Sequence, residues 1–132
     1  MNSLMIEASR SSPAIQFNAD HHRLSIRGES YPENAAAFYA PVFAWLKTFL
    51  VGLEPAVEVQ IDLEILYLNS SSTKVMLNFL DLLEQAAQDG KRIRVNWFYD
   101  PDNEAVLECG QDFSEELQVL TFNLVEKSQE PG

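Results

Sequence analysis

The chain has 132 residues, of which 46% are hydrophobic, and it carries a formal net charge of −11. This length predicts one domain that can bury roughly two-thirds of its unfolded surface without disulfides or metals. The negative charge argues against nucleic acid or an anionic membrane surface as a partner, because both would repel the protein. A protein partner with a basic surface is compatible with this negative charge.

The two chain ends and the single cysteine indicate the cellular setting. Residues 1–12 and 127–132 are rich in Ser, Glu, Pro and Gly, so we expect flexible termini around a domain that spans 13–126. Residues 1–12 lack the basic start and long apolar core of a secretory signal peptide. Cys109 excludes an internal disulfide and is expected to be a small apolar filler. We therefore expect a cytoplasmic protein.

In the first half of the chain we expect two short strands, at 14–17 and 23–27, joined by a hairpin turn over 18–22. His21 and His22 in that turn are expected to be solvated rather than metal ligands, since adjacent strand residues point to opposite faces. Residues 28–34 are predicted to form a loop that leads into a helix.

Residues 35–53 are largely apolar, and their length is marginal for a membrane span. Lys47 interrupts the run, Pro41 lies inside it, and Gly52 ends it. We therefore expect an amphipathic helix on a sheet and no direct membrane insertion. At Pro41 we expect a kink or a late helix start. The predicted apolar face comprises Phe38, Val42, Trp45, Leu46 and Phe49.

The second half of the chain continues the alternation of strand and helix. Residues 57–66 alternate between apolar and acidic or polar side chains, which predicts a strand with one face in the core. Residues 74–88 form the clearest amphipathic pattern, which Gly90 ends. The wide apolar arc of this helix indicates either deeper burial or a partly exposed contact surface. The remaining expected elements are a strand at 92–99, a short helix ending near Cys109, an acidic loop at 111–116 and a strand at 119–125.

The predicted order is β-β-α-β-α-β-α-β. It indicates a single α/β domain with a mixed sheet, in which an N-terminal hairpin is antiparallel and the later crossovers are parallel and right-handed.

Four consecutive hydroxyls, Ser70 to Thr73, lie where a strand passes into the most amphipathic helix. Asn69 or Ser70 can cap the helix N-terminus, but a cap uses only one or two such residues. A phosphate here would add roughly 1.5 to 2 negative charges. It would meet the positive end of the helix dipole, so it could prevent docking without refolding the domain.

An enzyme is not favoured by this sequence. We find no Gly-rich phosphate loop, no metal-ligand spacing and no nucleophile–base pair. The expectation is therefore a protein with no catalytic residues, no metal and no cofactor.

Five segments, taken together in their order and spacing, are characteristic: 12–15, 28–34, 66–72 with Lys74, 95–100 and 112–116. With them the chain resembles, from Ser12 to Val125, the SiaC-type regulatory phosphoproteins, a bacterial family. This resemblance implies a fold similar to STAS domains (SpoIIAA-like), the class of anti-anti-sigma factors.

The resemblance also implies a function. Such a protein binds and activates a diguanylate cyclase, in cyclic di-GMP signalling and biofilm control, while it is unphosphorylated. A cognate Ser/Thr kinase modifies it, and a PP2C-type phosphatase restores it. The family's acceptor directly follows Leu-Asn, which is Ser70 in this chain; the family has Thr there, so Ser70 keeps the hydroxyl but departs in type. Thr73 is the second candidate, although its hydroxyl can bond to the helix backbone.

We expect partner-binding residues in two places. One is the segment 69–74 that connects the strand to the amphipathic helix, called the joint below. The other is the loop at 28–34 before the first long helix. The residues of that loop are equally typical of an ordinary helix entry. The alternative function is an anti-anti-sigma factor acting on an anti-sigma kinase. The expected partner-binding residues are Asn69, Ser71, Ser72 and Lys74 in the joint, and Glu29, Tyr31, Glu33 and Asn34 in the loop.

Overall fold

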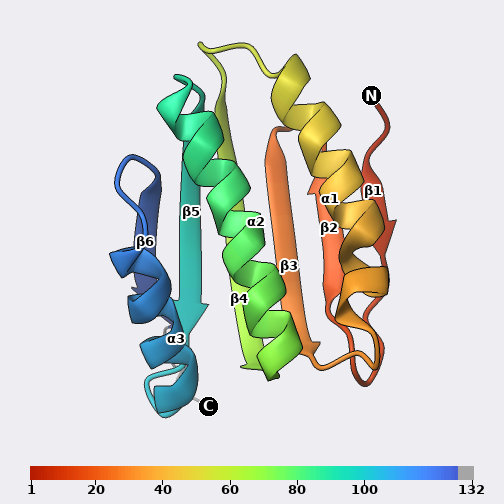
Figure 1. The fold of residues 1–132 in the computed structure, drawn as a ribbon, viewed down its shortest axis with the longest axis vertical. Coiled ribbons are helices and arrows are strands. Elements are labelled where there is room, and N and C mark those ends of the chain that lie inside the picture. Colours follow the sequence, from red (N-terminus) through yellow and green to blue (C-terminus); the bar gives the residue numbers. More distant parts are fainter. Residues whose placement is uncertain (128–132) are drawn as a thin grey trace.

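A six-stranded sheet with three helices on one face makes up residues 1–127, the part of the chain that this computed structural model describes (Figure 1). The elements in chain order are β1 (Leu4–Ile6), β2 (Ala14–Asn18), β3 (Arg23–Ser30), α1 (Ala35–Gly52), β4 (Glu58–Leu68), α2 (Ser70–Gln88), β5 (Arg92–Tyr99), α3 (Glu104–Glu115) and β6 (Thr121–Glu126).

The strands lie in the sheet in their sequence order, β1 to β6. β1, β2 and β3 pair antiparallel, whereas β3, β4, β5 and β6 pair parallel. Each parallel crossover advances in the same direction along the sheet, so connections of one hand place α1, α2 and α3 on one face. Their N-termini therefore gather at the edge where the parallel strands end (Figure 1). The predicted mixed-sheet α/β class is confirmed.

The core lies between the sheet and the helices. On β4 the helix-facing side chains are almost completely buried, as the alternation predicted: Val59, Ile61, Leu63 and Ile65 are at most 1% exposed. Helix α1 has the length and composition of a membrane span, but it packs Tyr39, Val42 and Leu46 into this core. Only 33% of its residues are buried, so α1 also keeps a long outer surface.

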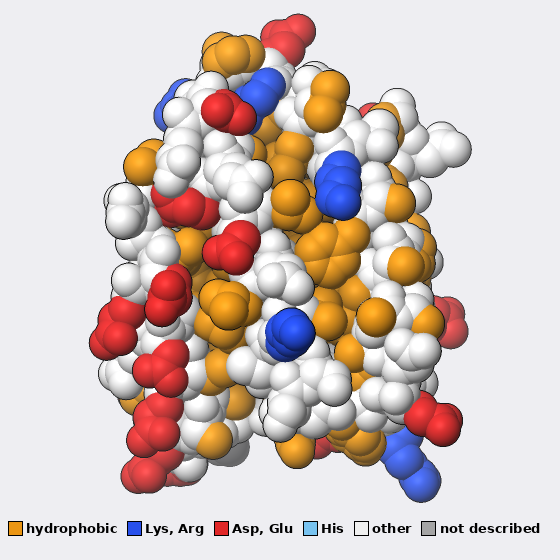
Figure 2. All heavy atoms as spheres, in the orientation of Figure 1, with side chains coloured by type: hydrophobic (Ala, Val, Ile, Leu, Met, Phe, Trp, Pro, Cys, Tyr) orange, Lys and Arg blue, Asp and Glu red, His pale blue; other side chains and the backbone are white. Residues whose placement is uncertain are grey.

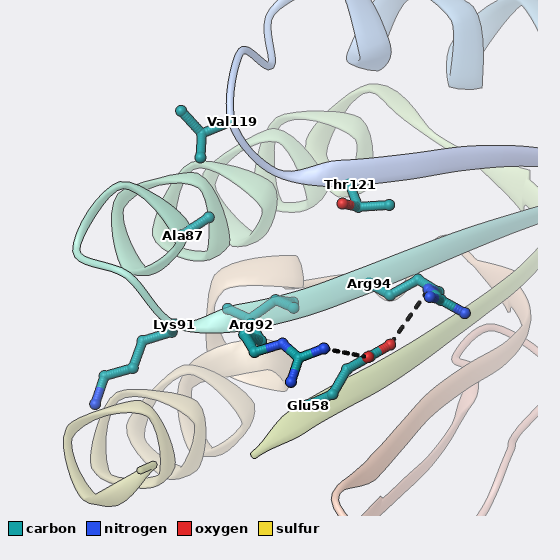
Figure 3. A pocket seen from close by; sticks show the side chains of 8 residues that line it. Glu58, Ala87, Lys91, Arg92, Arg94, Val119 and Thr121 are labelled. Atoms are coloured by element: carbon teal, nitrogen blue, oxygen red, sulfur yellow. Dashed lines mark hydrogen bonds and ion pairs between the residues drawn. The ribbon is translucent and has the colours of Figure 1, made fainter. Parts of the chain in front are cut away.

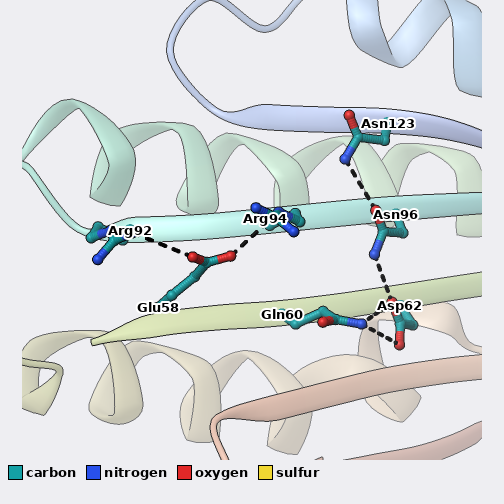
Figure 4. A network of polar contacts seen from close by, with 7 residues as sticks. All are labelled: Glu58, Gln60, Asp62, Arg92, Arg94, Asn96 and Asn123. Atoms are coloured by element: carbon teal, nitrogen blue, oxygen red, sulfur yellow. Dashed lines mark hydrogen bonds and ion pairs between the residues drawn. The ribbon is translucent and has the colours of Figure 1, made fainter. Parts of the chain in front are cut away.

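The opposite face of the sheet is open and polar, and charged ladders cross it (Figure 4). Glu58 lies 3.4 Å from Arg92 and 3.3 Å from Arg94, on the neighbouring strand. Asp62 accepts a 3.0 Å hydrogen bond from Asn96. Exposed ion pairs of this kind contribute at most about 1 kcal/mol each, so this face adds little to stability.

The N-terminal region differs from the prediction. Leu4–Ile6 forms an edge strand against β2, which the sequence did not indicate. The following segment is also tied to the domain, because the Tyr31 N–H donates to the Ser11 carbonyl at 2.7 Å and Ser12 is buried. The predicted flexible C-terminus, residues 127–132, lies outside the described residues except for Lys127.

Two other element boundaries also differ. β3 continues to Ser30, beyond the predicted end at Arg27, because Gly28 adopts a φ of 125° at a register shift against β4. Of the kink or late helix start predicted at Pro41, the late start is excluded, because Pro41 lies inside the helix. Helix α1 begins at Ala35, because the Asn34 side chain accepts from the Ala37 N–H and caps the helix there.

Helix α3 extends to Glu115, past the predicted end near Cys109 and through the segment predicted to be an acidic loop. Gly110, the residue after Cys109, does not end the helix. It lies inside the helix, where a β-carbon would come within 2.6 Å of the Trp97 ring. The glycine therefore allows α3 to approach the sheet closely and does not terminate the helix. The Trp97 indole N–H also donates to the Val106 carbonyl at 3.0 Å.

A buried carboxylate fastens the connection between α3 and β6. Glu84 on α2 is 8% exposed and accepts hydrogen bonds from the successive N–H groups of Gln118, Val119 and Leu120 at 3.0–3.1 Å. The Gln88 side chain donates a further bond of 2.9 Å. Burial alone would raise the pKa of the Glu84 carboxyl, but these hydrogen bonds outweigh it and hold the pKa below its ordinary value.

We predict that Glu84→Gln lowers the free energy of unfolding by about 2 kcal/mol at pH 7, since buried N–H groups lose a charged acceptor. Because the folded pKa is depressed, this contribution is complete above the unfolded glutamate pKa of about 4.3 and is lost as pH falls through the folded pKa. Urea unfolding of both proteins from pH 7 to pH 3 should therefore show the gap closing. Glu108→Gln, an exposed change on α3, is the control; an equal loss in it would contradict the assignment.

Candidate functional site at the N-terminus of helix α2

The hydroxyl run is the first turn of α2. Asn69 is the N-cap, and its side-chain oxygen accepts from the Ser72 N–H at 2.9 Å. The Asn69 N–H itself donates to the Ser30 carbonyl at 3.1 Å, which fixes the joint to the end of β3. Of the two caps that the sequence allowed, the structure therefore has Asn69. Ser70 is then the first helical residue, and it is exposed.

The four hydroxyls have different surroundings. Ser70 and Ser71 are exposed, whereas Ser72 is 1% exposed. The Thr73 hydroxyl donates to the Asn69 carbonyl at 2.9 Å, which confirms that it bonds to the helix backbone. Ser72 had been expected among the partner-binding residues; this is corrected, because its side chain points into the core and cannot contact a partner.

Ser72 belongs to a buried chain of hydroxyls that joins three elements. Ser30 on β3 donates to Ser72 at 2.8 Å and lies 2.7 Å from the Tyr39 hydroxyl on α1. Because Ser30 has one hydroxyl proton and gives it to Ser72, Tyr39 is the donor to Ser30. Burial raises the pKa of the Tyr39 hydroxyl more than the Ser30 hydrogen bond lowers it, so Tyr39 remains a neutral donor. This chain sets the position of α2 relative to α1.

A β-bulge shapes the other side of the joint. Between Gly28 and Glu29 the register against β4 jumps from Ile65 to Tyr67, which leaves Leu66 as the extra residue. The Asn103 side chain donates to the Leu66 carbonyl at 3.1 Å and also caps α3. Beyond the bulge, Tyr67 lies edge-on to Tyr31 at a ring distance of 5.8 Å. Both rings remain about 40% exposed, and Tyr67 lies near the end of β4, three residues before Ser70 in the chain.

Two hollows lie on either side of the first turn of α2. One, of about 750 Å³, is lined by Glu33 and Asn34 from the start of α1 and by Ser71 and Lys74 from α2, so it brings together the two predicted groups. The other, of about 480 Å³, is formed between β4, α2 and α3. Its lining includes Leu66, Tyr67, Thr73, Asn103 and Cys109. Glu29 is exposed at the end of β3 and lines neither hollow.

The sequence reasoning missed Tyr67, Asn103 and the Tyr39–Ser30 pair. Tyr67 had a detectable signal, because the strict alternation of β4 breaks into three apolar residues at 66–68, which is typical of a bulge. For Asn103 the sequence indicates only a possible helix cap. Nothing in the local sequence could have connected Tyr39 with Ser30 and Ser72, since those contacts span up to 42 positions.

The site is suited to receiving an anion on Ser70. By helix geometry the N–H groups of Ser70 and Ser71 have no intrahelical acceptor, and the dipole gives this end partial positive charge. Lys74 lies one turn along on the same helix face as Ser70. Within residues 1–127, no group of three or more His, Cys, Asp or Glu side chains could hold a metal. Burial and then the Asp112 carboxylate raise the pKa of Cys109 to about 11, so this thiol is a poor nucleophile.

A further hollow of about 240 Å³ lies at the opposite edge of the sheet, where β5 begins (Figure 3). Its basic side chains are already engaged: Arg92 and Arg94 both contact Glu58, and Lys91 donates to the Leu53 carbonyl. With its cations neutralised in this way, it is a weaker candidate than the joint.

The comparisons with known proteins agree with this geometry. Residues 6–127 match the model of the SiaC family regulatory phosphoproteins. An uncharacterized protein of Pseudomonas aeruginosa (strain UCBPP-PA14) is 43% identical over 117 residues, which cover 88% of this chain and 90% of that protein.

Solved structures match the whole domain. SiaC of Pseudomonas aeruginosa superposes with a TM-score of 0.87 at 37% identity, covering 96% of this chain and 100% of that chain. The crystal structure of the diguanylate cyclase SiaD in complex with its activator SiaC, also from Pseudomonas aeruginosa, gives the same TM-score at 39% identity. That match covers 94% of this chain and 99% of the matched chain.

We predict that Ser72→Ala lowers the free energy of unfolding by about 1–2 kcal/mol, because the buried Ser30 hydroxyl then has no acceptor. Ser71→Ala, one residue away and exposed, should change it by less than about 0.5 kcal/mol. Urea unfolding followed by circular dichroism measures both. Equal effects of the two substitutions would show that the hydroxyl chain does not stabilise the joint.

Proposed function

Because the chain belongs to the SiaC family of regulatory phosphoproteins, we propose that it binds and activates a diguanylate cyclase while Ser70 is unphosphorylated. The observation that carries this proposal is the position of Ser70. Its hydroxyl is exposed on the first turn of a capped helix, between two hollows, whereas Ser72 and Thr73 are engaged in internal hydrogen bonds. Ser70 is thus the acceptor that both geometry and family resemblance favour.

The physical basis of the switch is local charge. A phosphate on Ser70 gains the free N–H groups of the first turn and the Lys74 ammonium, so the domain tolerates it. A partner docked over the same turn would have to desolvate that dianion or place its own carboxylates near it. Like charges forced together at an interface cost several kcal/mol, which is enough to abolish binding. The fold itself would not change.

The neighbouring surface is suited to protein–protein contact. Tyr31 and Tyr67 form an exposed aromatic pair, and tyrosine is among the residues that most often dominate binding energy. Ser71, Lys74, Glu33 and Asn34 supply a polar rim around the adjacent hollow. In the solved complex SiaC is the activator of the cyclase SiaD, which supports the same role for this chain. In this proposal the protein is a cytoplasmic, non-enzymatic regulator.

Two further partners complete the proposal. A cognate Ser/Thr kinase adds the phosphate, and a PP2C-type phosphatase removes it. The exposure of Ser70 at a helix start leaves its hydroxyl accessible to both. Family membership favours this cycle over the anti-anti-sigma alternative, which has the same switch logic but acts on an anti-sigma kinase.

We predict that co-expression with the cognate kinase adds one phosphate, at Ser70. Mass spectrometry of the intact protein and its peptides measures this, and Ser70→Ala should remove the modification. Ser71→Ala, which retains the acceptor, should leave it in place. Undiminished phosphorylation of Ser70→Ala, for example at Thr73, would show that the acceptor is wrong.

We also predict that the unmodified protein raises the rate of cyclic di-GMP synthesis by the purified cyclase, and that Ser70→Asp weakens cyclase binding at least tenfold, a loss of about 1.4 kcal/mol. Calorimetry and a turnover assay measure the two effects. Gln111→Glu adds a negative charge on the exposed surface of α3 and should bind as the wild type does. Equal binding by wild type and Ser70→Asp would refute the switch.

A further inference from the structure

The outer edge of β6 is unprotected. Strand β6 is the last strand of the sheet and pairs only with β5 among the described residues, so its other side presents free backbone N–H and C=O groups (Figure 1). Proteins usually shield such an edge with a short strand, a proline, a lysine or a bulge. The opposite edge strand, β1, has only three residues, whereas β6 has six in an uninterrupted register and contains none of these devices. The edge of β6 is therefore suited to pairing with another strand.

The side chains along this edge are uncharged. Residues 121–125 include no charged side chain, although 22% of the whole chain is charged. On the helix-facing side, Phe122 is partly buried against the core and Leu124 is 37% exposed. On the open face, Thr121 and Asn123 are exposed. A strand added at this edge would cover Leu124 and would meet no charge over these five residues.

A ladder of amides on the open face ends at the same edge (Figure 4). The Asp62 carboxylate accepts from the Asn96 side-chain N–H at 3.0 Å, so the Asn96 side-chain oxygen is turned toward β6. That oxygen accepts from the Asn123 side chain at 3.1 Å. Figure 4 shows the Asn123 oxygen pointing away from Asn96. Asn123 therefore gives one N–H to the ladder and keeps its carbonyl oxygen and its second N–H for a group beyond the edge.

We propose that β6 pairs antiparallel with β6 of a second copy of this chain, around a two-fold axis at Asn123, so that the two sheets join into one. A two-fold interface must be self-complementary, because the same patch contacts itself. In this register Asn123 lies opposite its own copy, and the two amides can exchange hydrogen bonds. Phe122 lies opposite Leu124 of the second copy, and Thr121 lies opposite Val125 of the second copy.

The register follows from the side chains, since directly opposite residues of an antiparallel pair lie on the same face. An axis at Leu124 would place Phe122 opposite Glu126, an apolar ring against a carboxylate. An axis at Phe122 would extend the pairing to Leu120, whose N–H is already bonded to Glu84. The proposed axis avoids both conflicts.

The net charge of the protein opposes this dimer. Each copy carries −11, and Figure 2 shows acidic side chains along the side where α3 lies. The two α3 helices lie on the same face of the joined sheet, on either side of the axis, so their exposed carboxylates repel each other. Within residues 1–127 these carboxylates form no ion pair that would neutralise them: Glu104, Glu108, Asp112 and Glu115. The dimer should therefore be weak, and it should tighten as salt screens the repulsion.

The dimer goes beyond the proposed function and does not depend on it. Strand β5 lies between β6 and β4, so Ser70 at the start of α2 stays outside the strand pair. A dimer would present two copies of the joint, and a partner with two binding sites would engage both with higher avidity. A chain that fails to dimerise would still be open to cyclase binding and phosphorylation, which are measured separately.

The first test adds one carboxylate at the proposed axis. Asn123→Asp places two like charges directly opposite each other, which destabilises a strand pair. Gln16→Glu is the matched control, because it adds the same charge in the same row of the open face but on β2. Circular dichroism and thermal unfolding should show both variants folded.

Sedimentation equilibrium from about 10 µM to about 1 mM, the range in which weak complexes dissociate, measures the effect. The wild type and Gln16→Glu should show a monomer–dimer equilibrium, and Asn123→Asp should have a dissociation constant at least tenfold higher. A wild type that is monomeric over the whole range would overturn the proposal. Equal dissociation constants in all three proteins would place the interface elsewhere and would overturn it too.

The second test varies the salt concentration. The wild-type dissociation constant should fall at least threefold between about 50 mM and about 500 mM NaCl, because an uncharged strand pair between two anions gains from screening. An interface held by opposite charges would weaken instead, and that result would contradict the pairing through β6.

The third test measures the register in a Cys109→Ser background. Thr121→Cys and Val125→Cys should form a mixed disulfide dimer when the two proteins are oxidised together, because opposite β-carbons lie about 4.5–5.5 Å apart. Neither variant alone should crosslink, since two copies of either residue are about 13 Å apart along the strands. Mass spectrometry and non-reducing electrophoresis identify the products. Absence of the mixed dimer, or equal crosslinking by one variant alone, would refute the axis at Asn123.

Discussion

All three helices lie on one face because every parallel crossover advances in the same direction along the sheet. This constraint has two consequences for the site. It gathers the three helix N-termini at one edge, where the last residues of β3 and β4 also end. It also places α1 and α2 side by side and parallel, so the seam between them opens at the same edge as Ser70. The proposed acceptor Ser70 and the seam beside it are thus brought to one edge by a single topology.

The joint combines a rigid interior with an accessible exterior. Ser30 is central to this arrangement, since its carbonyl holds the Asn69 N–H and its hydroxyl links Tyr39 with Ser72. The buried hydroxyl of Ser72 holds the first turn of the helix against β3, whereas the hydroxyl of Ser70 is exposed to solvent. A helix cap at Asn69 and a proposed phosphorylation site at Ser70 are therefore compatible. The side chains of this turn point in different directions, so the residues that hold the helix are not the residue that is exposed.

Local patterns predicted much of this molecule. The alternation in β4 and the helical periodicity of α2 are strong because each element has one buried face. The position between them indicated only a run of four hydroxyls, and the choice of Ser70 came from family resemblance and stays a prediction. The failures have a common physical origin in distant contacts. Gly110 resembles a helix stop until Trp97 is placed against it, and Glu84 resembles a surface carboxylate until the loop at 118–120 folds onto it. Likewise, Ser72 could be separated from Ser70 and Ser71 only once Ser30 was known to lie beneath it.

The open face of the sheet gives the molecule an electrical polarity. Five of its nine basic residues pair with carboxylates on that face, although the chain as a whole carries 20 acidic residues. The carboxylates in these pairs are only three, Glu58, Asp62 and Glu64, so the pairs carry a net positive charge and the excess negative charge lies elsewhere on the molecule. The protein is therefore a dipole as well as an anion. The electric field of a basic partner domain orients such a dipole before the two proteins touch. This orientation speeds association, and added salt slows association because it screens the field.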